Sequence, residues 1–217
     1  MMIRDDALLP PRRSFLARIA AAGAALGLPG LAAADEGSRA AEEPWMTRVK
    51  GSHRVVFHSH EPTNGLCFSW ARNFLNTQRE SYGAKDEDST VIVGLNGRAV
   101  GMLYNDAMWA RYPIAKVLGM PHARNPWQSP LDGSGVAATD TVEALRQRGV
   151  IVLVCNNSLR MGAIRFHPDG AKSDEATRAA FYADAKANLI PGVEIVPAMI
   201  VTLSQAQQRK CGYVYAG

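Results

Sequence analysis

The stretch Val150-Ile151-Val152-Leu153-Val154-Cys155-Asn156-Asn157-Ser158 decides the fold. Its uninterrupted apolar and mostly β-branched run is typical of a parallel strand buried on both faces. Ligands of open α/β sheets collect just beyond the carboxyl ends of the strands. Here Asn156, Asn157 or Ser158 is expected to cap a following helix, whose free N–H groups favour an anion. The pattern therefore predicts a reactive thiolate at Cys155; the alternative is a small buried hydrophobe, the commonest role of a free Cys.

The N-terminus has the features of a bacterial twin-arginine export signal. Arg12-Arg13-Ser14-Phe15-Leu16 precedes a mildly apolar region that is rich in Ala, Leu and Gly and ends in Leu31-Ala32-Ala33-Ala34. We expect cleavage after Ala34 and a periplasmic protein without a stable membrane anchor. The alternative is an amphipathic first helix of the fold.

The charge balance of the chain argues against nucleic-acid binding. The chain has 24 Lys and Arg against 20 Asp and Glu, and the predicted signal holds four of the Arg and two of the Asp. The mature part is thus nearly neutral and has no basic run. Its length of about 183 residues suffices for one domain with a proper core.

Three cysteines, Cys67, Cys155 and Cys211, are too few for a disulfide framework. The absence of a CxxC motif excludes a thioredoxin-like site and the usual structural zinc sites at the level of pattern. Cys67 falls in the apolar stripe of a predicted helix, which favours core packing. A single bridge from Cys67 to Cys155 or Cys211 remains the alternative.

Strands and helices alternate along the chain, which predicts a mostly parallel sheet of about five strands with helices on both faces. The predicted strands cover residues 53–58, 90–95, 150–155, 193–197 and 211–215. The predicted helices cover residues 65–79, 98–118 with a break at Pro113, 140–148, 159–163, 173–189 and 198–209. Thr63 or Asn64 is the expected cap of the first helix, and Asp140 that of the helix before the central strand.

Two segments carry no regular pattern. Residues 35–52 are polar and are interpreted as a flexible tether, so that the domain begins near His53. Residues 119–137 form a long loop, which in a compact domain is typical of a lid or an interface segment. Trp127 in its middle favours a packed loop over a disordered surface excursion.

The order of these elements resembles the DsrE/DsrF-like sulfur-relay family over roughly His53 to Tyr215. The resemblance rests on Cys155 entering Asn156-Asn157-Ser158-Leu159, on the stretch Leu189 to Ala198, on Gln207 and on Gly212-Tyr213-Val214-Tyr215. It implies a three-layer α/β/α fold, assembly into oligomers and, in some members, a Cys that carries sulfur as a persulfide. Cys155 occupies the matching position.

A metal site is the main alternative. His58 and His60 are separated by one residue at the end of the first strand, where extended geometry places both imidazoles on the same side. Together with Cys155 they form a set of ligands compatible with copper or zinc. Either imidazole, if protonated, would instead stabilise a thiolate. Arg160 could neutralise an anionic sulfur species, or lie on the surface in solvent.

We therefore expect an exported periplasmic α/β/α protein that binds or relays sulfur on Cys155, with His58, His60, Asn156, Asn157 and Arg160 as binding residues. No cofactor is expected, and the partner would be a sulfur donor or acceptor protein or a small sulfur compound. The alternatives are a copper- or zinc-binding protein and a non-catalytic accessory subunit. A homo-oligomer is also expected, with contacts through Met108, Trp109, Tyr112 and Trp127.

Overall fold

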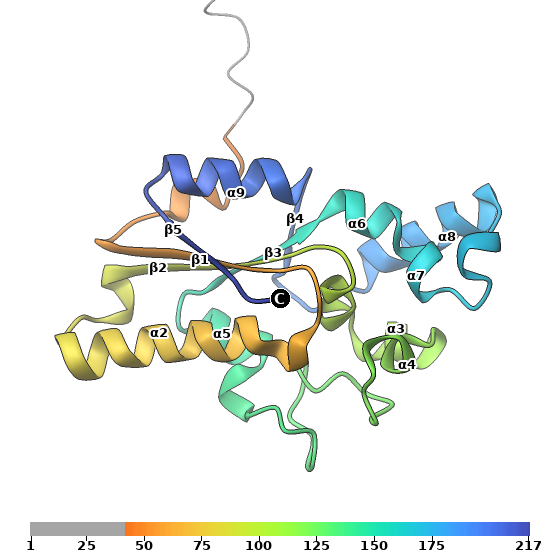
Figure 1. Cartoon of the computed structure of the whole chain (residues 1–217), viewed down its shortest axis with the longest axis horizontal. Helices are drawn as coiled ribbons and strands as arrows, with labels where there is room; N and C mark the ends of the chain where they lie inside the picture. The colour runs from red at the N-terminus through yellow and green to blue at the C-terminus, as the bar shows by residue number, and fades with distance from the viewer. Residues whose placement is uncertain (1–41) are drawn as a thin grey trace, which may run out of the picture. The chain divides into compact units, whose positions relative to one another are not determined.

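A parallel sheet forms the centre of the protein in the computed structural model, which describes residues 42–217 (Figure 1). Five strands lie in the order β4-β3-β2-β1-β5, and all neighbours are parallel. The strands are β1 (His53–Ser59), β2 (Ser89–Leu95), β3 (Ile151–Cys155), β4 (Glu194–Val196) and β5 (Gly212–Tyr215). The predicted fold class and its five strands are confirmed.

Helices cover both faces of the sheet, so the domain has three layers (Figure 1). The 3-10 helix η1 (Met46–Arg48) and α9 (Met199–Gln208) lie on one face. The other face carries most of the remaining helices. These are α2 (Leu66–Tyr82), η4 (Ala99–Leu103), α3 (Asp106–Arg111), α4 (Ile114–Leu118), α5 (Val142–Gln147), α6 (Asn156–Arg160), α7 (Gly162–Phe166) and α8 (Glu175–Ala187). Short 3-10 turns η2 (Thr63–Gly65), η3 (Asp86–Asp88), η5 (Ala138–Asp140) and η6 (Gly170–Lys172) complete the connections.

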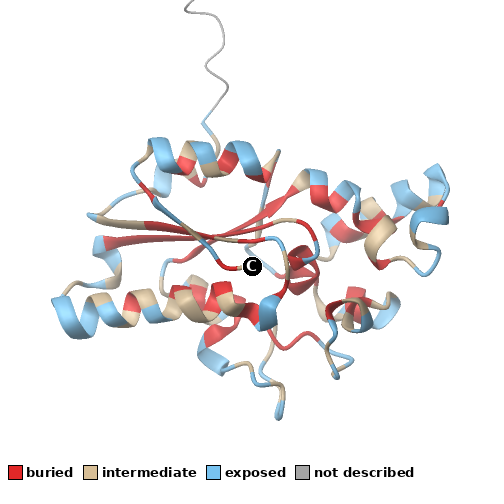
Figure 2. Ribbon diagram, in the orientation of Figure 1, coloured by how far each residue is buried: buried red, intermediate tan, exposed pale blue. Residues whose placement is uncertain are grey.

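The alternation of side chains along each strand supplies two cores. On β3, Val152 and Val154 face the larger core, which α2 and α5 cover, whereas Ile151, Leu153 and Cys155 face the smaller core beneath α9. All five residues of β3 are buried, as Figure 2 shows for the centre of the sheet. This explains why β3 reads as an unbroken apolar run, although β2 and not β3 is the central strand of the sheet.

The predicted caps of three helices, α2, α5 and α6, were wrong. Gly65, with a φ of 73°, takes the cap position of α2, because Thr63 Oγ1 donates a hydrogen bond to the Ala216 carbonyl instead. Thr141 Oγ1, and not Asp140, accepts the Ala144 N–H at the start of α5.

The helix after β3 begins directly at Asn156, so Cys155 itself is the residue that precedes its first turn. The expected side-chain caps Asn156, Asn157 and Ser158 therefore lie inside α6. Ser158 Oγ instead accepts the Gly97 N–H at 3.0 Å, which ties α6 to the loop after β2.

The domain starts earlier than predicted, since its compact unit covers Glu43–Gly217. Trp45 is buried in the core beneath α9, where the Arg209 guanidinium lies 5.9 Å from its ring. The expected tether of residues 35–52 is therefore wrong for its last part. The predicted export signal over residues 1–34 lies outside the described residues.

The long loop of residues 119–137 is packed onto the domain, as predicted from Trp127. Asn125 is fully buried, and its Nδ2 donates to the carbonyls of Met102 and Tyr104 at 2.8 and 2.6 Å. Its Oδ1 accepts the Trp127 N–H at 2.8 Å. This one side chain thus fixes the loop to the segment that contains η4.

The expected oligomer contacts are wrong in their residues. Trp127 and Met108 are fully buried, and Trp109 packs against Trp127 with ring centroids 6.4 Å apart. Tyr112 is partly buried against the same core. These large side chains fill their own domain, so they leave no apolar face for a second copy; an oligomer formed through other residues stays a prediction.

The three cysteines are buried and unpaired, so the alternative of a disulfide from Cys67 is wrong. Cys67 lies in the larger core without exposure, as predicted. Within residues 42–217, no helix combines the length and apolar character needed to span a membrane.

Candidate functional site at the carboxyl edge of the sheet

Cys155 lies where the connections of two neighbouring strands separate. After β3 the chain continues through α6, α7 and α8 on one face of the sheet, and after β4 it continues through α9 on the other. Cys155 pairs with Val196 across this boundary. Such a switch between neighbouring parallel strands opens the crevice in which α/β proteins bind ligands. The topology therefore puts the thiol at the expected place for chemistry.

The Cys155 sulfur receives a hydrogen bond from the first residue of α9. The Met199 backbone N–H donates to Cys155 Sγ at 3.4 Å, and α6 starts at the residue that follows Cys155. Unpaired N–H groups of a helix start favour a negative charge. Only 5% of Cys155 is exposed, so the sulfur is largely shielded from solvent.

The other two thiols have surroundings that oppose ionisation. Burial raises the pKa of Cys67 to about 12, although a hydrogen bond with Ser59 acts in the opposite direction. Burial also raises the pKa of Cys211, against the attraction of Arg54 and Arg209. Cys211 precedes β5 and so lies at the amino edge, and Cys67 is fully buried in the larger core, so Cys155 remains the candidate for sulfur chemistry.

His58 and His60 meet at a shared partner, Asn96. Asn96 Oδ1 lies 3.0 Å from His58 Nε2 and 3.1 Å from His60 Nδ1. Because an amide oxygen only accepts hydrogen bonds, both imidazoles donate to it. The predicted placement of the two imidazoles on one side of the strand is thus confirmed.

A fourth residue completes this polar network. His58 Nδ1 lies 3.0 Å from the Tyr213 hydroxyl, and neutral His58 accepts that O–H because its Nε2 carries the proton. The His58 ring also lies 5.6 Å from that of Tyr215. The network therefore spans β1, β5 and the loop after β2.

Burial lowers the pKa of His58 from its usual 6.5; the hydrogen bond with Asn96 opposes this effect, and the nearby His60 adds to it. The surroundings of His58 therefore disfavour the protonated imidazole that was suggested as a stabiliser of the Cys155 thiolate. The helix start that faces the sulfur is the group that can stabilise the thiolate.

Asn156 and Arg160 are held by an aromatic residue of α8. The Tyr182 hydroxyl donates to Asn156 Oδ1 at 2.7 Å. Arg160 Cζ and Lys186 Nζ lie 4.8 and 4.4 Å from the centroid of the Tyr182 ring. Arg160 is thus an exposed side chain stacked on a ring, and not a direct neighbour of the sulfur.

Asn157 is exposed on α6, and among residues 42–217 its side chain takes no part in the hydrogen-bond network around Asn96. Among residues 42–217, no group of three or more His, Cys, Asp or Glu side chains is arranged to hold a metal ion. His58, His60 and Cys155 therefore do not converge into the ligand set that the sequence suggested.

Several residues of the site were missed by sequence reasoning. Asn96, Tyr213 and Met199 contact the predicted residues directly, and Tyr182 orients Asn156. The signal for Asn96 was available, because Asn96-Gly97 ends a buried strand at the same edge. Tyr213 and Met199 are far from their partners in the sequence, and no local pattern indicates such contacts.

Comparisons with known proteins add little. No protein-family model matches the chain, and no curated protein matches it significantly. A solved structure that resembles it is the Protein of Unknown Function MTH1491 from Methanobacterium thermoautotrophicum, at 18% identity and a TM-score of 0.43. The alignment covers 76% of this chain and 99% of that one. No function follows from a similarity of this level.

Proposed function

We propose that the protein binds or relays sulfur as a persulfide on Cys155, as the resemblance to the DsrE/DsrF-like family implies. The observation that carries the proposal is the position of Cys155 Sγ. It lies at the switch between β3 and β4 and accepts the Met199 N–H from the start of α9 at 3.4 Å. This surrounding favours an anionic sulfur, either the thiolate or the persulfide.

The transfer needs no cofactor. The Cys155 thiolate attacks the terminal sulfur of a donor persulfide, and a new S–S bond forms to Cys155 Sγ. The S–S bond of the donor breaks, and the donor leaves as a thiolate that takes up a proton from solvent. No net oxidation or reduction occurs, so a sulfur donor and a sulfur acceptor are the only reactants.

Neighbouring polar groups would bind the donor at the same edge of the sheet. Asn96 directly follows Leu95, which pairs with Val154, the residue before Cys155. The imidazoles of His58 and His60 are fixed by Asn96, and Asn156 is fixed by Tyr182. These groups are therefore oriented before a ligand arrives, which lowers the entropic cost of binding.

A second candidate is a non-catalytic accessory protein in which Cys155 only packs. The burial of Cys155 among the apolar side chains beneath α9 favours this function. The metal-binding alternative has no comparable support, because its three ligands do not form a group.

Sulfur loading followed by intact-mass measurement separates the two candidates. Purified protein is incubated with inorganic polysulfide, desalted and weighed before and after reduction. The relay proposal expects an added mass of one or more sulfur atoms that reduction removes. The addition should be lost in Cys155→Ser and retained in Cys67→Ser and Cys211→Ser. Loading that is absent, or that survives in Cys155→Ser, refutes the relay.

Export to the periplasm and assembly into a homo-oligomer belong to the same proposal. The twin-arginine segment supports export, and fractionation of cells that produce the full chain tests it. Replacement of Arg12 and Arg13 by Lys should retain the protein in the cytoplasm. Light scattering of the mature chain tests assembly, and a monomer at micromolar concentration contradicts it.

A further inference from the structure

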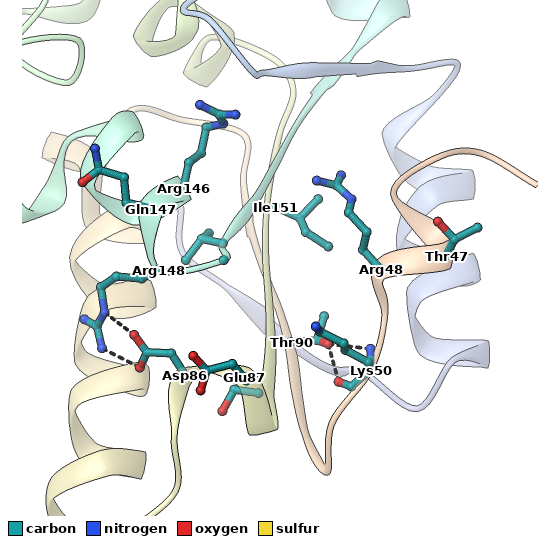
Figure 3. A pocket seen from close by; sticks show the side chains of 13 residues that line it. Thr47, Arg48, Lys50, Asp86, Glu87, Thr90, Arg146, Gln147, Arg148 and Ile151 are labelled. Carbon is teal, nitrogen blue, oxygen red and sulfur yellow. Dashed lines mark hydrogen bonds and ion pairs between the residues drawn. The ribbon is translucent and has the colours of Figure 1, made fainter.

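A cavity lies at the opposite, amino-terminal edge of the sheet. It has a volume of about 550 Å³, within the range of small-molecule sites. Its lining comes from the segment before β1, from η3, from the start of β2 and from the turn between α5 and β3 (Figure 3). Because Cys155 lies at the other end of β3, this cavity is separate from the sulfur site.

Cations from three segments line this cavity. They are Arg48 on η1, Lys50 before β1, and Arg146 and Arg148 at the end of α5. Arg148 is neutralised by Asp86, to which it donates two hydrogen bonds at 2.8 and 3.0 Å. Arg48 and Arg146 each form one ion pair as well, with Glu194 and Glu143, so Lys50 is the lining cation without a carboxylate partner among residues 42–217.

These three cations keep free hydrogen-bond donors. Arg48 pairs with Glu194 and Arg146 with Glu143, each through one nitrogen, whereas a guanidinium has five N–H donors. Among residues 42–217, the Lys50 ammonium has no ion-pair partner. Figure 3 shows Arg48 and Arg146 on the two sides of the cavity.

The backbone is shaped to keep Arg146 in this position. A Cβ atom on Gly192 would lie 1.9 Å from Arg146 Cζ, so the guanidinium lies directly against a residue that has no side chain. The φ of Gly192 is 80°, which other residues rarely adopt. Arg146 is thus packed, and only about a third of its side chain is exposed.

A hydroxyl without a partner lines the same cavity. Ser89 lines the cavity and is 8% exposed, and its Oγ makes no hydrogen bond among the described residues. A buried hydroxyl without a partner is costly. Rotation of χ1 to another staggered position lets this hydroxyl donate to a ligand oxygen.

We propose that this cavity binds a small molecule through a phosphate group. Phosphate oxygens match guanidinium donors in geometry and charge, and the Lys50 ammonium and Ser89 hydroxyl supply further donors. Glu87 also lines the cavity and has no arginine partner among residues 42–217, so its carboxylate disfavours a phosphate placed next to it and favours one placed beside the cations.

Titration calorimetry of the full mature chain with phenyl phosphate and with inorganic phosphate tests the proposal. We expect one site with a dissociation constant below about 1 mM for at least one probe. Arg48→Gln and Arg146→Gln should each weaken binding about tenfold, as expected for a lost charge-assisted hydrogen bond. Arg79→Gln is the matched control, since Arg79 is an exposed arginine on α2 outside this cavity.

Ser89→Ala separates binding from folding. Because the Ser89 hydroxyl is buried without a partner, its removal should leave the urea midpoint unchanged or raise it, while the phosphate affinity falls. Tighter binding of phenyl phosphate than of inorganic phosphate assigns the site to an ester, and equal binding assigns it to free phosphate. The proposal is overturned if neither probe saturates a site, or if Arg48→Gln and Arg146→Gln bind like Arg79→Gln.

Discussion

Replacement of Asn125 by Ala should release the loop of residues 119–137. The Asn125 side chain makes three hydrogen bonds in a fully buried position, two to the carbonyls of Met102 and Tyr104 and one from the Trp127 N–H. Each lost bond that leaves a buried polar group without a partner costs about 1 kcal/mol or more. We therefore expect Asn125→Ala to lower the free energy of unfolding by about 3 kcal/mol.

Asn125→Asp sharpens this test. A carboxylate has the shape of the amide but no N–H donor, so it brings an acceptor oxygen against the Met102 and Tyr104 carbonyls. Its cost should exceed that of Asn125→Ala, because a buried charge is added to the lost bonds.

Urea unfolding monitored by circular dichroism measures both variants. Asn73→Ala is the control, since Asn73 is exposed on α2 and the change to Ala should alter stability by less than about 0.7 kcal/mol. A loss below about 1 kcal/mol in Asn125→Ala would show that the loop is not held by this side chain.

Three further predictions concern the site and its surroundings. Burial lowers the pKa of His58 in the folded protein below 6.5, its value in the unfolded chain. The stability that neutral His58 contributes is therefore fully present above pH 6.5 and is lost as the pH falls through the pKa of the folded protein. Urea unfolding at several pH values should show that the free energy of unfolding depends less on acid in His58→Gln. Gly97→Ala should destabilise the fold by about 1 kcal/mol or more, because Gly97 has a φ of 57° and the added Cβ would lie 2.5 Å from the His60 ring. An unchanged urea midpoint together with an unchanged proton spectrum of His60 would contradict this prediction. Thr141→Ala should cost about 1 kcal/mol through the lost cap of α5, and an equal effect of the neighbouring exposed Thr139→Ala would argue against a capping role.

All five strands were placed within a few residues. The strands β2 and β3 were predictable because a strand buried on both faces needs a continuous apolar stretch such as Ile151 to Val154, whereas β4 and β5 are short and partly exposed. The long helices α2, α8 and α9 followed from their periodicity and from the glycines and prolines around them. Helix starts were less predictable. Thr63 and Ser158 bond to distant residues, and the sequence alone does not show whether a polar side chain will cap or make a tertiary contact.

The burial of large side chains was only half determined by the sequence. Trp109 and Trp127 were correctly identified as groups that must be covered, but the sequence could not tell whether their own domain or a second copy covers them. The structure shows that Trp109 and Trp127 cover each other in the core. A buried Trp45 in a polar segment was missed altogether, because one aromatic residue leaves no periodic signal.

By itself, the sequence determined the layer architecture, the position of Cys155 at the end of a buried strand and the placement of His58 and His60 on one side at the end of β1. These features depend on local spacing, which backbone geometry converts into faces and edges. Only the tertiary structure decided what surrounds Cys155, because the Met199 N–H that reaches its sulfur comes from a helix 44 residues later in the chain. In the same way it gave both imidazoles a common partner in Asn96 and brought Arg48, Lys50 and Arg146 together at the other edge. Contacts between distant segments depend on how the sheet is ordered and covered, and that order is a property of the whole chain.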